Sequence, residues 1–268
     1  DVSLRAAVDA AVFASAPDTY AKLIEGLRAD LADHTEEGYA YRVDFRLRPF
    51  GSSGELVTSL TELQRYYLHE ASLWEVQASL KLRPIAGNVS AGNRFLSLLL
   101  PLWTEQRSRN DVGASISSLR DKAMKHYAKA AGAVIDVKTG IGGIRDIEFL
   151  AQGLQLVHAH AFPEILSGNT LDALDKLAAC ELLPHQMAGQ LRADYVFLRR
   201  IEHYLQILED RQIHALPKKR EELTALARRI LGIQATADEF MEEVDACLRR
   251  VHDAYLESLS PRNETRGK

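Results

Sequence analysis

The chain has 268 residues, of which 46% are hydrophobic and 26% charged, and its formal net charge is −4. This composition is typical of globular protein and allows one large or two modest domains. The slightly acidic balance gives no reason to expect a nucleic acid or an anionic membrane as partner. Cys180 and Cys247 lie far apart and lack metal-ligand spacing, so we expect reduced cysteines and a cytoplasmic protein.

Residues 1–34 are predicted to be helical, with an interruption at Pro17. A strictly alternating stretch, YRVDFRLR, follows at residues 41–48. It predicts a strand with one apolar face and one face that carries Asp44, Arg46 and Arg48. A carboxylate among guanidiniums suits a metal-bound polyphosphate, and the alternative is an edge strand whose mixed charges face solvent.

Gly51 and Ser52 begin a Gly-Ser-Ser-Gly loop directly after this stretch. Backbone N–H groups of such a loop can bind phosphate oxygens, although a plain turn is the alternative. Ser59 or Thr61 is then predicted to cap a helix, with Glu62 in its first turn.

Lys81 and Arg83 lie two residues apart in a segment, residues 76–85, that predicts either a strand or a helix end. In a strand both side chains would share one face and could reach phosphates. As surface charges they would have no role in a site.

Beyond about residue 90 the pattern is almost entirely helical, apart from a short predicted strand at 134–138. The glycine-rich turn at 140–143 leads into a helix that starts near Ile144. A turn of this kind can bind an anion, or it can simply allow close packing.

Two helices carry polar residues along one face. In the first, Arg145 would contact nucleotide or phosphate and Glu148 would orient it, and the alternative is a salt-bridged solvent face. In the second, over residues 191–210, the polar face includes Glu202 and His203. We expect His203 to make an interdomain hydrogen bond rather than to act as a general base.

Five stretches, in order, resemble the glutamine synthetase adenylyltransferase/adenylyl-removing enzyme family. They are VDFRLRPFGSSGELV at 43–57, WEVQASLKLRPIAG at 74–87, GIGGIRDIEFLAQ at 140–152, NTLDALDKLAACELLP at 169–184 and FLRRIEHYLQILEDRQIHALP at 197–217. The residues of these stretches are more similar to those of the N-terminal, adenylyl-removing unit of that family.

The resemblance implies an α+β fold that is mostly α overall. It implies an incomplete polymerase-beta-like nucleotidyltransferase domain over residues 1–90, followed by a helical bundle domain over 91–268. It also implies transfer of AMP to a tyrosine of glutamine synthetase, or its removal by phosphorolysis. Mg²⁺ is the implied cofactor, ATP, AMP and inorganic phosphate are the substrates, and glutamine synthetase and a PII-type signalling protein are the partners.

The same resemblance implies the site residues. Asp44 matches the third carboxylate of the family's metal-binding triad. It is the predicted metal ligand and, with Arg46 and Arg48, a predicted catalytic residue. The residues predicted to bind the substrates are Gly51, Ser52, Lys81, Arg83, Arg145 and Glu148.

The chain departs from the family at the first two metal ligands, which belong to an Asp-x-Asp motif that these 268 residues lack. Because the chain begins at Asp1, we expect a fragment with that motif encoded upstream. The alternative is a non-catalytic, nucleotidyltransferase-like regulatory or binding module. A nucleic-acid polymerase is disfavoured by the acidic balance, and the longest apolar run is too short to span a membrane.

Overall fold

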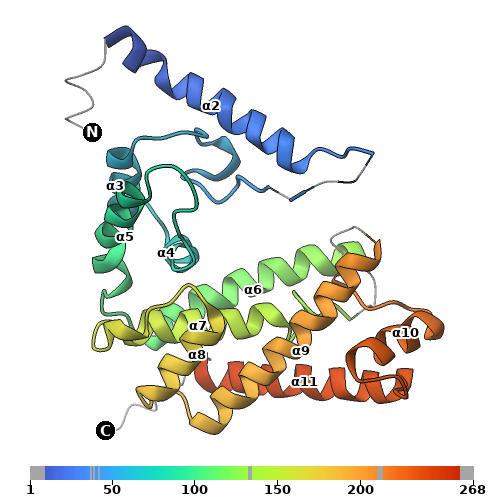
Figure 1. Cartoon of the computed structure of the whole chain (residues 1–268). Helices are drawn as coiled ribbons and strands as arrows, with labels where there is room; N and C mark the ends of the chain where they lie inside the picture. Colours follow the sequence, from blue (N-terminus) through green and yellow to red (C-terminus); the bar gives the residue numbers. More distant parts are fainter. Residues whose placement is uncertain are drawn as a thin grey trace, which may run out of the picture. The chain divides into compact units, whose positions relative to one another are not determined.

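The structure is a computed structural model that describes residues 10–36, 38, 40, 41, 43–131, 135–209 and 214–259. These residues are mostly helical (Figure 1). The helices are α2 (Ala10–Ala32), η1 (Gly51–Ser53), α3 (Leu60–His69), α4 (Leu73–Ser79), α5 (Val89–Trp103), α6 (Arg109–Ala131), α7 (Ile144–His158), η2 (Pro163–Ile165), α8 (Thr170–Ala179), α9 (His185–Glu209), α10 (Arg220–Ile230) and α11 (Ala237–Leu259). None of those in the described ranges is long and apolar enough to cross a membrane.

The chain divides into two compact units. The first comprises Asp1–Ala71 and Ser90–Leu99, and the second comprises Ser72–Val89 and Leu100–Lys268. Helix α4 and the segment that carries Lys81 therefore belong to the second unit. The expected family domains, 1–90 and 91–268, stay a prediction.

The first unit begins with α2, which runs through Pro17 without ending. The predicted interruption is therefore wrong. A proline removes one backbone hydrogen bond, and the hydrogen bonds of the turns on either side still hold the helix.

The start of α3 confirms the predicted cap. The Ser59 hydroxyl accepts from the backbone N–H of Glu62 at 3.2 Å, and the Glu62 carboxylate accepts from the backbone N–H of Ser59 at 3.2 Å. This reciprocal capping box satisfies two N–H groups that the first helical turn leaves unpaired. It also holds the Glu62 carboxyl pKa below its ordinary value, chiefly through the Ser59 hydroxyl.

An aromatic row forms the packing of the first unit. The Phe50 ring lies edge-on to Tyr66 with ring centroids 5.0 Å apart, Tyr66 lies edge-on to Tyr67 at 5.8 Å, and Tyr67 lies edge-on to Phe95 at 6.1 Å. Edge-to-face pairs at these distances are favourable. They join the loop after residue 48, α3 and the middle of α5.

The predicted strand at 41–48 is wrong for the residues that the structure describes there. The backbone N–H of Arg46 donates to the Asp44 carboxylate at 3.0 Å, and the backbone N–H of Arg48 donates to the Arg46 carbonyl at 3.0 Å. These local hydrogen bonds take the place of a hydrogen-bond ladder between strands, because no described segment pairs with this one as a second strand. The apolar face is accordingly incomplete, since Tyr41 and Leu47 are 69% and 76% exposed.

The short strand predicted at 134–138 is also absent from its described residues, 135–138. Asp136 makes one isolated bridge, with Ala215. Its carboxylate accepts from the backbone N–H groups of Lys138 and Thr139, both at 2.7 Å. This turn stops the pairing after one residue.

The second unit is organised around α7, which packs against α4, α6, α8, α9 and α11 (Figure 1). Eleven of its fifteen residues are buried. The helix begins at Ile144 with Gly143 as its N-cap, as the sequence predicts. Because it is enclosed by neighbouring helices, its polar side chains need partners inside the protein.

Asp146 on the first turn of α7 is buried, at 2% exposure, and carries the main ion pair of the bundle. Its carboxylate accepts from Nε and Nη2 of Arg120 on α6, both at 2.7 Å. The Arg120 guanidinium also lies 4.8 Å from the ring centre of Tyr255 on α11. One arginine thus links α6, α7 and α11.

Gly142, in the turn before α7, allows a close approach between backbones. Its φ is +73°, and a Cβ there would lie 1.9 Å from the Leu248 carbonyl oxygen of α11. Only glycine fits both the conformation and the space. The glycine turn therefore serves close packing.

Replacing Gly142 by alanine should lower the free energy of unfolding by about 3 kcal/mol or more, because a backbone must move and a positive φ is strained. Gly189→Ala on α9 is the control, since nothing lies within 4 Å of a Cβ there. It should raise stability by about 0.5–1 kcal/mol. Urea denaturation of both variants measures the difference, and equal stabilities would contradict the packing described.

Asp146→Asn should destabilise the protein by about 3 kcal/mol, because it leaves Arg120 without its buried counter-charge. The matched control is Asp238→Asn, which breaks an exposed pair between Asp238 and Arg220 of the same two-bond geometry. That control should unfold at the same urea concentration as the parent chain. A similar, small effect from both changes would show that the buried pair does not hold the bundle.

Candidate functional site

The three predicted catalytic residues lie together in the loop of the first unit, but Asp44 and Arg46 bind each other. The Arg46 Nε lies 3.0 and 3.1 Å from the two Asp44 oxygens, and its Nη2 lies 2.7 Å from Oδ2. Both side chains are exposed, at 72% for Arg46 and 40% for Asp44. The Asp44 carboxylate, by hydrogen bond and charge, raises the Arg46 pKa above its ordinary value.

Arg48 has a different position, because it holds the loop together. Its guanidinium donates to the carbonyl oxygens of Phe45 at 2.6 Å, Gly54 at 3.1 Å and Ser52 at 3.3 Å. An arginine that satisfies three carbonyls fixes a loop more than it binds a ligand. Its described contacts therefore point to a structural part in the loop.

The predicted phosphate loop, Gly51 and Ser52, forms the 3-10 turn η1. The Gly51 N–H donates to the Arg48 carbonyl at 2.9 Å, and the Gly54 N–H donates to the Gly51 carbonyl at 3.3 Å. Phe50 and Gly51 both have positive φ, 60° and 59°. These N–H groups close the turn, so the described loop is folded on itself.

A metal site needs several oxygen ligands, and the described residues contain no group of three His, Cys, Asp or Glu side chains that could hold one. Asp44 already has both oxygens bound to Arg46. The described residues therefore do not form a magnesium site by themselves.

In the second unit the structure brings together two residues predicted to bind the substrates. Lys81 Nζ lies 2.7 Å from Oε1 of Glu148. The Tyr195 hydroxyl donates to the same oxygen at 3.2 Å. Burial, and then the Glu148 charge, raises the pKa of Tyr195 above its ordinary value.

The other two predicted residues of this unit lie apart from that cluster. Arg83 is exposed in the irregular segment after α4, so the helix-end alternative for residues 76–85 holds and the strand alternative does not. Arg145 lies with its guanidinium 6.0 Å from the ring centre of Phe149. Glu148 binds Lys81 and Tyr195, and the described contacts include no bond from Glu148 to Arg145.

Two further polar residues on this face of α7, Gln152 and Gln155, lie neither in a cleft nor in solvent. Gln152 is buried and accepts a hydrogen bond from Gln77 of α4 at 2.8 Å. Gln155 is buried and accepts from the backbone N–H of Ser167 at 2.7 Å. These two amides fasten α7 to its neighbours.

The glycine turn offers no anion site either, because its N–H groups are already used. Gly142 donates to the Asp146 carboxylate at 2.7 Å, Gly143 donates to Gly140, and Ile144 donates to Val137. Asp146 thus occupies the place that an external anion would take.

A cavity of about 430 Å³ lies beside Lys81, between α9 and the start of α8. We call it the basic pocket. Four side chains that carry or can carry positive charge line it: Lys81, Arg199, Arg200 and His203. Gly168, Asn169, Thr170, Leu171, Tyr195 and Val196 complete its lining.

Glu202, on α9, lies next to this pocket in sequence but points into the core, with 1% exposure. It accepts from Arg199 Nη1 at 2.7 Å and lies 3.1 Å from Lys138 Nζ. The prediction placed Glu202 on the polar face with His203. The structure separates them, because Glu202 is buried and His203 is exposed.

The sequence pattern does not reveal the basic pocket. It places Arg199 on the polar face of its helix with Glu202 and His203, but it indicates no role for Arg200 or Thr170. The neighbouring charges on α9 were a usable signal, but their meeting with Lys81 depends on the tertiary fold.

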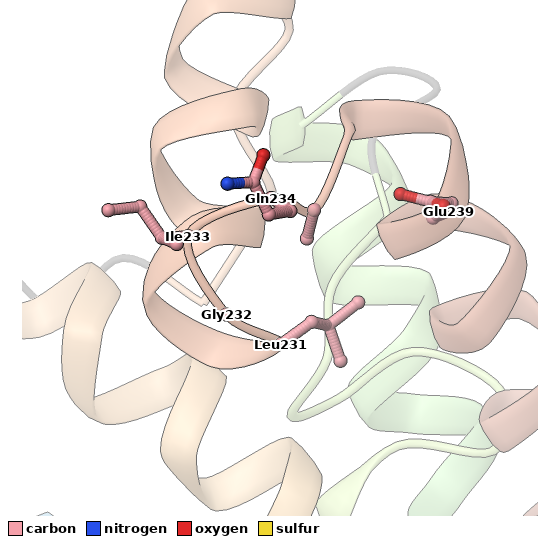
Figure 2. Close-up of a pocket in the computed structure, with 6 residues that line it drawn as sticks. Leu231, Gly232, Ile233, Gln234 and Glu239 are labelled. Carbon is pink, nitrogen blue, oxygen red and sulfur yellow. The ribbon is translucent and has the colours of Figure 1, made fainter.

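Two other cavities have a different character. One, of about 460 Å³, lies in the loop between α10 and α11, where Ile233 points away from Leu231 and Glu239 comes from α11 (Figure 2). The other, of about 280 Å³ in the first unit, is lined by three glutamates, Glu55, Glu62 and Glu70, with Arg65. Neither gathers cations as the basic pocket does.

Comparison with known families gives two matches along the chain. Residues 4–98 match the family model of glutamate-ammonia ligase adenylyltransferase. Residues 112–258, more than half of the chain, match the model of GlnD PII-uridylyltransferase. The first match covers the loop with Asp44, and the second covers most of the second unit.

Individual relatives extend over nearly the whole chain. Two are named bifunctional glutamine synthetase adenylyltransferase/adenylyl-removing enzyme. The one from Methylococcus capsulatus is 35% identical over 250 residues, 93% of this chain and 26% of the relative. The one from Nitrosococcus oceani is 40% identical over 210 residues, 78% of this chain and 21% of the relative. The chain thus spans about a quarter of the length of these relatives.

Replacing Glu148 by glutamine should lower the pKa of Tyr195, because the phenolate would no longer form beside a negative charge. Burial should still keep that pKa above its ordinary value. NMR titration of chains with ¹³C-labelled tyrosine measures the shift. Glu222→Gln, in the exposed pair with Lys219, is the control and should leave Tyr195 unchanged. An unchanged pKa in Glu148→Gln would contradict the contact.

Proposed function

Since the chain belongs to the family of glutamine synthetase adenylyltransferase/adenylyl-removing enzymes, we propose that it is part of a nucleotidyltransferase acting on glutamine synthetase. It attaches AMP to a tyrosine of that enzyme, or removes AMP by phosphorolysis. The relatives, at 33–40% identity over most of the chain, carry this proposal.

In the removal reaction an oxygen of inorganic phosphate attacks the AMP phosphorus, and the bond from phosphorus to the tyrosine oxygen breaks. The products are ADP and a tyrosine whose oxygen takes up a proton. Both reactants are anions, so cations must offset their repulsion. The more detailed assignment to the adenylyl-removing unit rests on the residues within the sequence motifs.

In the first unit we assign Asp44 and Arg46 to the reacting phosphate. The Asp44–Arg46 ion pair supports this role, because an incoming phosphate can replace the Asp44 carboxylate on Arg46 and so release Asp44. Coordination of Mg²⁺ by Asp44 stays a prediction, because the described residues provide no cluster of further ligands. Those ligands would have to come from residues other than the described ones.

The domain and partner assignments belong to the same proposal. A polymerase-beta-like domain would contribute residues 1–90, and the helical domain would contribute residues 91–268. The match of residues 112–258 to a PII-uridylyltransferase model supports a PII-type protein as a second partner. A cytoplasmic location would follow from these partners. The relatives are named as enzymes, which does not favour a non-catalytic module.

In the protein expressed from its whole gene, Asp44→Ala should abolish AMP removal. It should leave the thermal unfolding temperature unchanged, because the side chain is exposed. The assay measures ADP formed from adenylylated glutamine synthetase with and without inorganic phosphate. The reverse direction is followed by incorporation of labelled AMP.

The matched control is Asp238→Ala, which removes another exposed carboxylate bound to an arginine and should keep full activity. Normal turnover by Asp44→Ala in both directions would exclude the assigned part of Asp44. Absence of both reactions in the unaltered protein would favour the non-catalytic module.

A further inference from the structure

We propose that the basic pocket binds a phosphate group, supplied either by inorganic phosphate or by AMP. Its charged lining comes from separate parts of the chain: Lys81 follows α4, and Arg199, Arg200 and His203 lie on α9. No aspartate or glutamate is among the described residues that line it. Cations gathered around a cavity repel one another, and an anion between them relieves that repulsion.

Most hydrogen-bond donors of these side chains have no partner within the described part of the protein. Arg199 gives one bond, to Glu202, and Arg200 gives one bond, to the carbonyl of Ile230 at 3.1 Å. A guanidinium has five N–H donors in a planar fork that suits phosphate oxygens. Two arginines on adjacent positions therefore offer a phosphate several further bonds.

The carboxylates behind the pocket orient its cations without cancelling them. Glu148 holds Lys81, and Glu202 holds Arg199. Glu202 is also paired with Lys138, which does not line the pocket. Lys81, Arg199 and Arg200 line the pocket, and Lys138 adds a fourth cation outside its lining. These four cations outnumber the two carboxylates, so the surroundings of the pocket keep a net positive charge.

The backbone places Lys81 at the pocket by close packing. A Cβ on Gly168 would lie 3.0 Å from the Leu80 carbonyl oxygen, so the turn at 80–81 lies directly against the segment before α8. The N–H groups of Leu171 and Asp172, in the first turn of α8, are already used, since the Asn169 side chain accepts from both. Side chains, rather than a helix end, make the site.

The cavity size fits the proposed ligand class. A volume of about 430 Å³ lies within the range of small-ligand pockets, about 300–1,000 Å³, and admits phosphate or a mononucleotide. That this phosphate is the attacking anion or the AMP phosphoryl group of the removal reaction rests on the proposed function. The affinity itself does not depend on it.

Calorimetry on the 268-residue chain tests the proposal with three probes: inorganic phosphate, AMP and adenosine. Phosphate or AMP should bind, and adenosine, which lacks the phosphate, should not. Tighter binding of AMP than of phosphate identifies the nucleotide as the source, and the reverse order identifies the free anion. No binding of either phosphate compound, or equal binding of adenosine, would overturn the proposal.

Arg200→Gln should raise the dissociation constant of the bound probe about 10-fold, because one charge-assisted hydrogen bond is lost. Arg200→Lys should recover part of that loss, and Lys81→Gln, in a separate segment, should give a comparable loss. Arg192→Gln is the control, because Arg192 lies on the same helix and its described partner is Asp175, away from the pocket lining. Equal affinities of Arg200→Gln and Arg192→Gln would overturn the proposal.

The same titration on the unaltered protein, run beside the assay of ADP formation, separates the two proposals. Turnover without phosphate binding in the pocket would contradict this inference alone, and binding without turnover in the unaltered protein would contradict the proposed function alone.

Discussion

A carboxylate that the second unit buries needs a partner, and this requirement determines how its helices pack. Of the four that are buried among its described residues, Asp136 is bound by backbone N–H groups and the other three by cations. Asp146 is bound by Arg120, Asp194 by Arg250 at 2.7 Å, and Glu202 by Lys138 and Arg199. An unpaired charge at these depths would be strongly unfavourable. The pairs therefore fix α6 to α7, α9 to α11, and α9 to the segment before α7.

This constraint also explains where positive charge reaches the surface. Lys81, which is bound to Glu148, and Arg199, which is bound to Glu202, both line the basic pocket beside α8. Anion chemistry needs preorganised charges, because reorientation during the reaction would cost free energy. A lysine and an arginine that are fixed by buried or half-buried carboxylates meet that need.

Local signals in the sequence predicted local structure well. The Ser59–Glu62 cap and the helix start at Ile144 depend on neighbours within a few residues. The strand at 41–48 was wrong because alternation describes a strand only where a second strand pairs with it. For α7, the periodicity predicted a polar face toward a cleft or toward solvent, and it did not reveal that other helices enclose this helix and bury Gln152 and Gln155.

The candidate site shows the same limit. Asp44, Arg46 and Arg48 are adjacent in sequence, and the structure does bring them together. The contact between Lys81 and Glu148 crosses 67 positions of the chain, and only the resemblance to a family put both residues in one site. Arg200 was not predicted, because its neighbours in the pocket come from segments far away in sequence.

The most direct test of the account is to find where a phosphate-like anion binds in crystals of the chain. Tungstate, which scatters X-rays anomalously, would mark that position. We expect its strongest peak in the basic pocket, within hydrogen-bond distance of Arg199, Arg200 and Lys81. A strongest peak at the Gly51–Ser52 loop or at the glycine turn before α7, with the basic pocket empty, would contradict it.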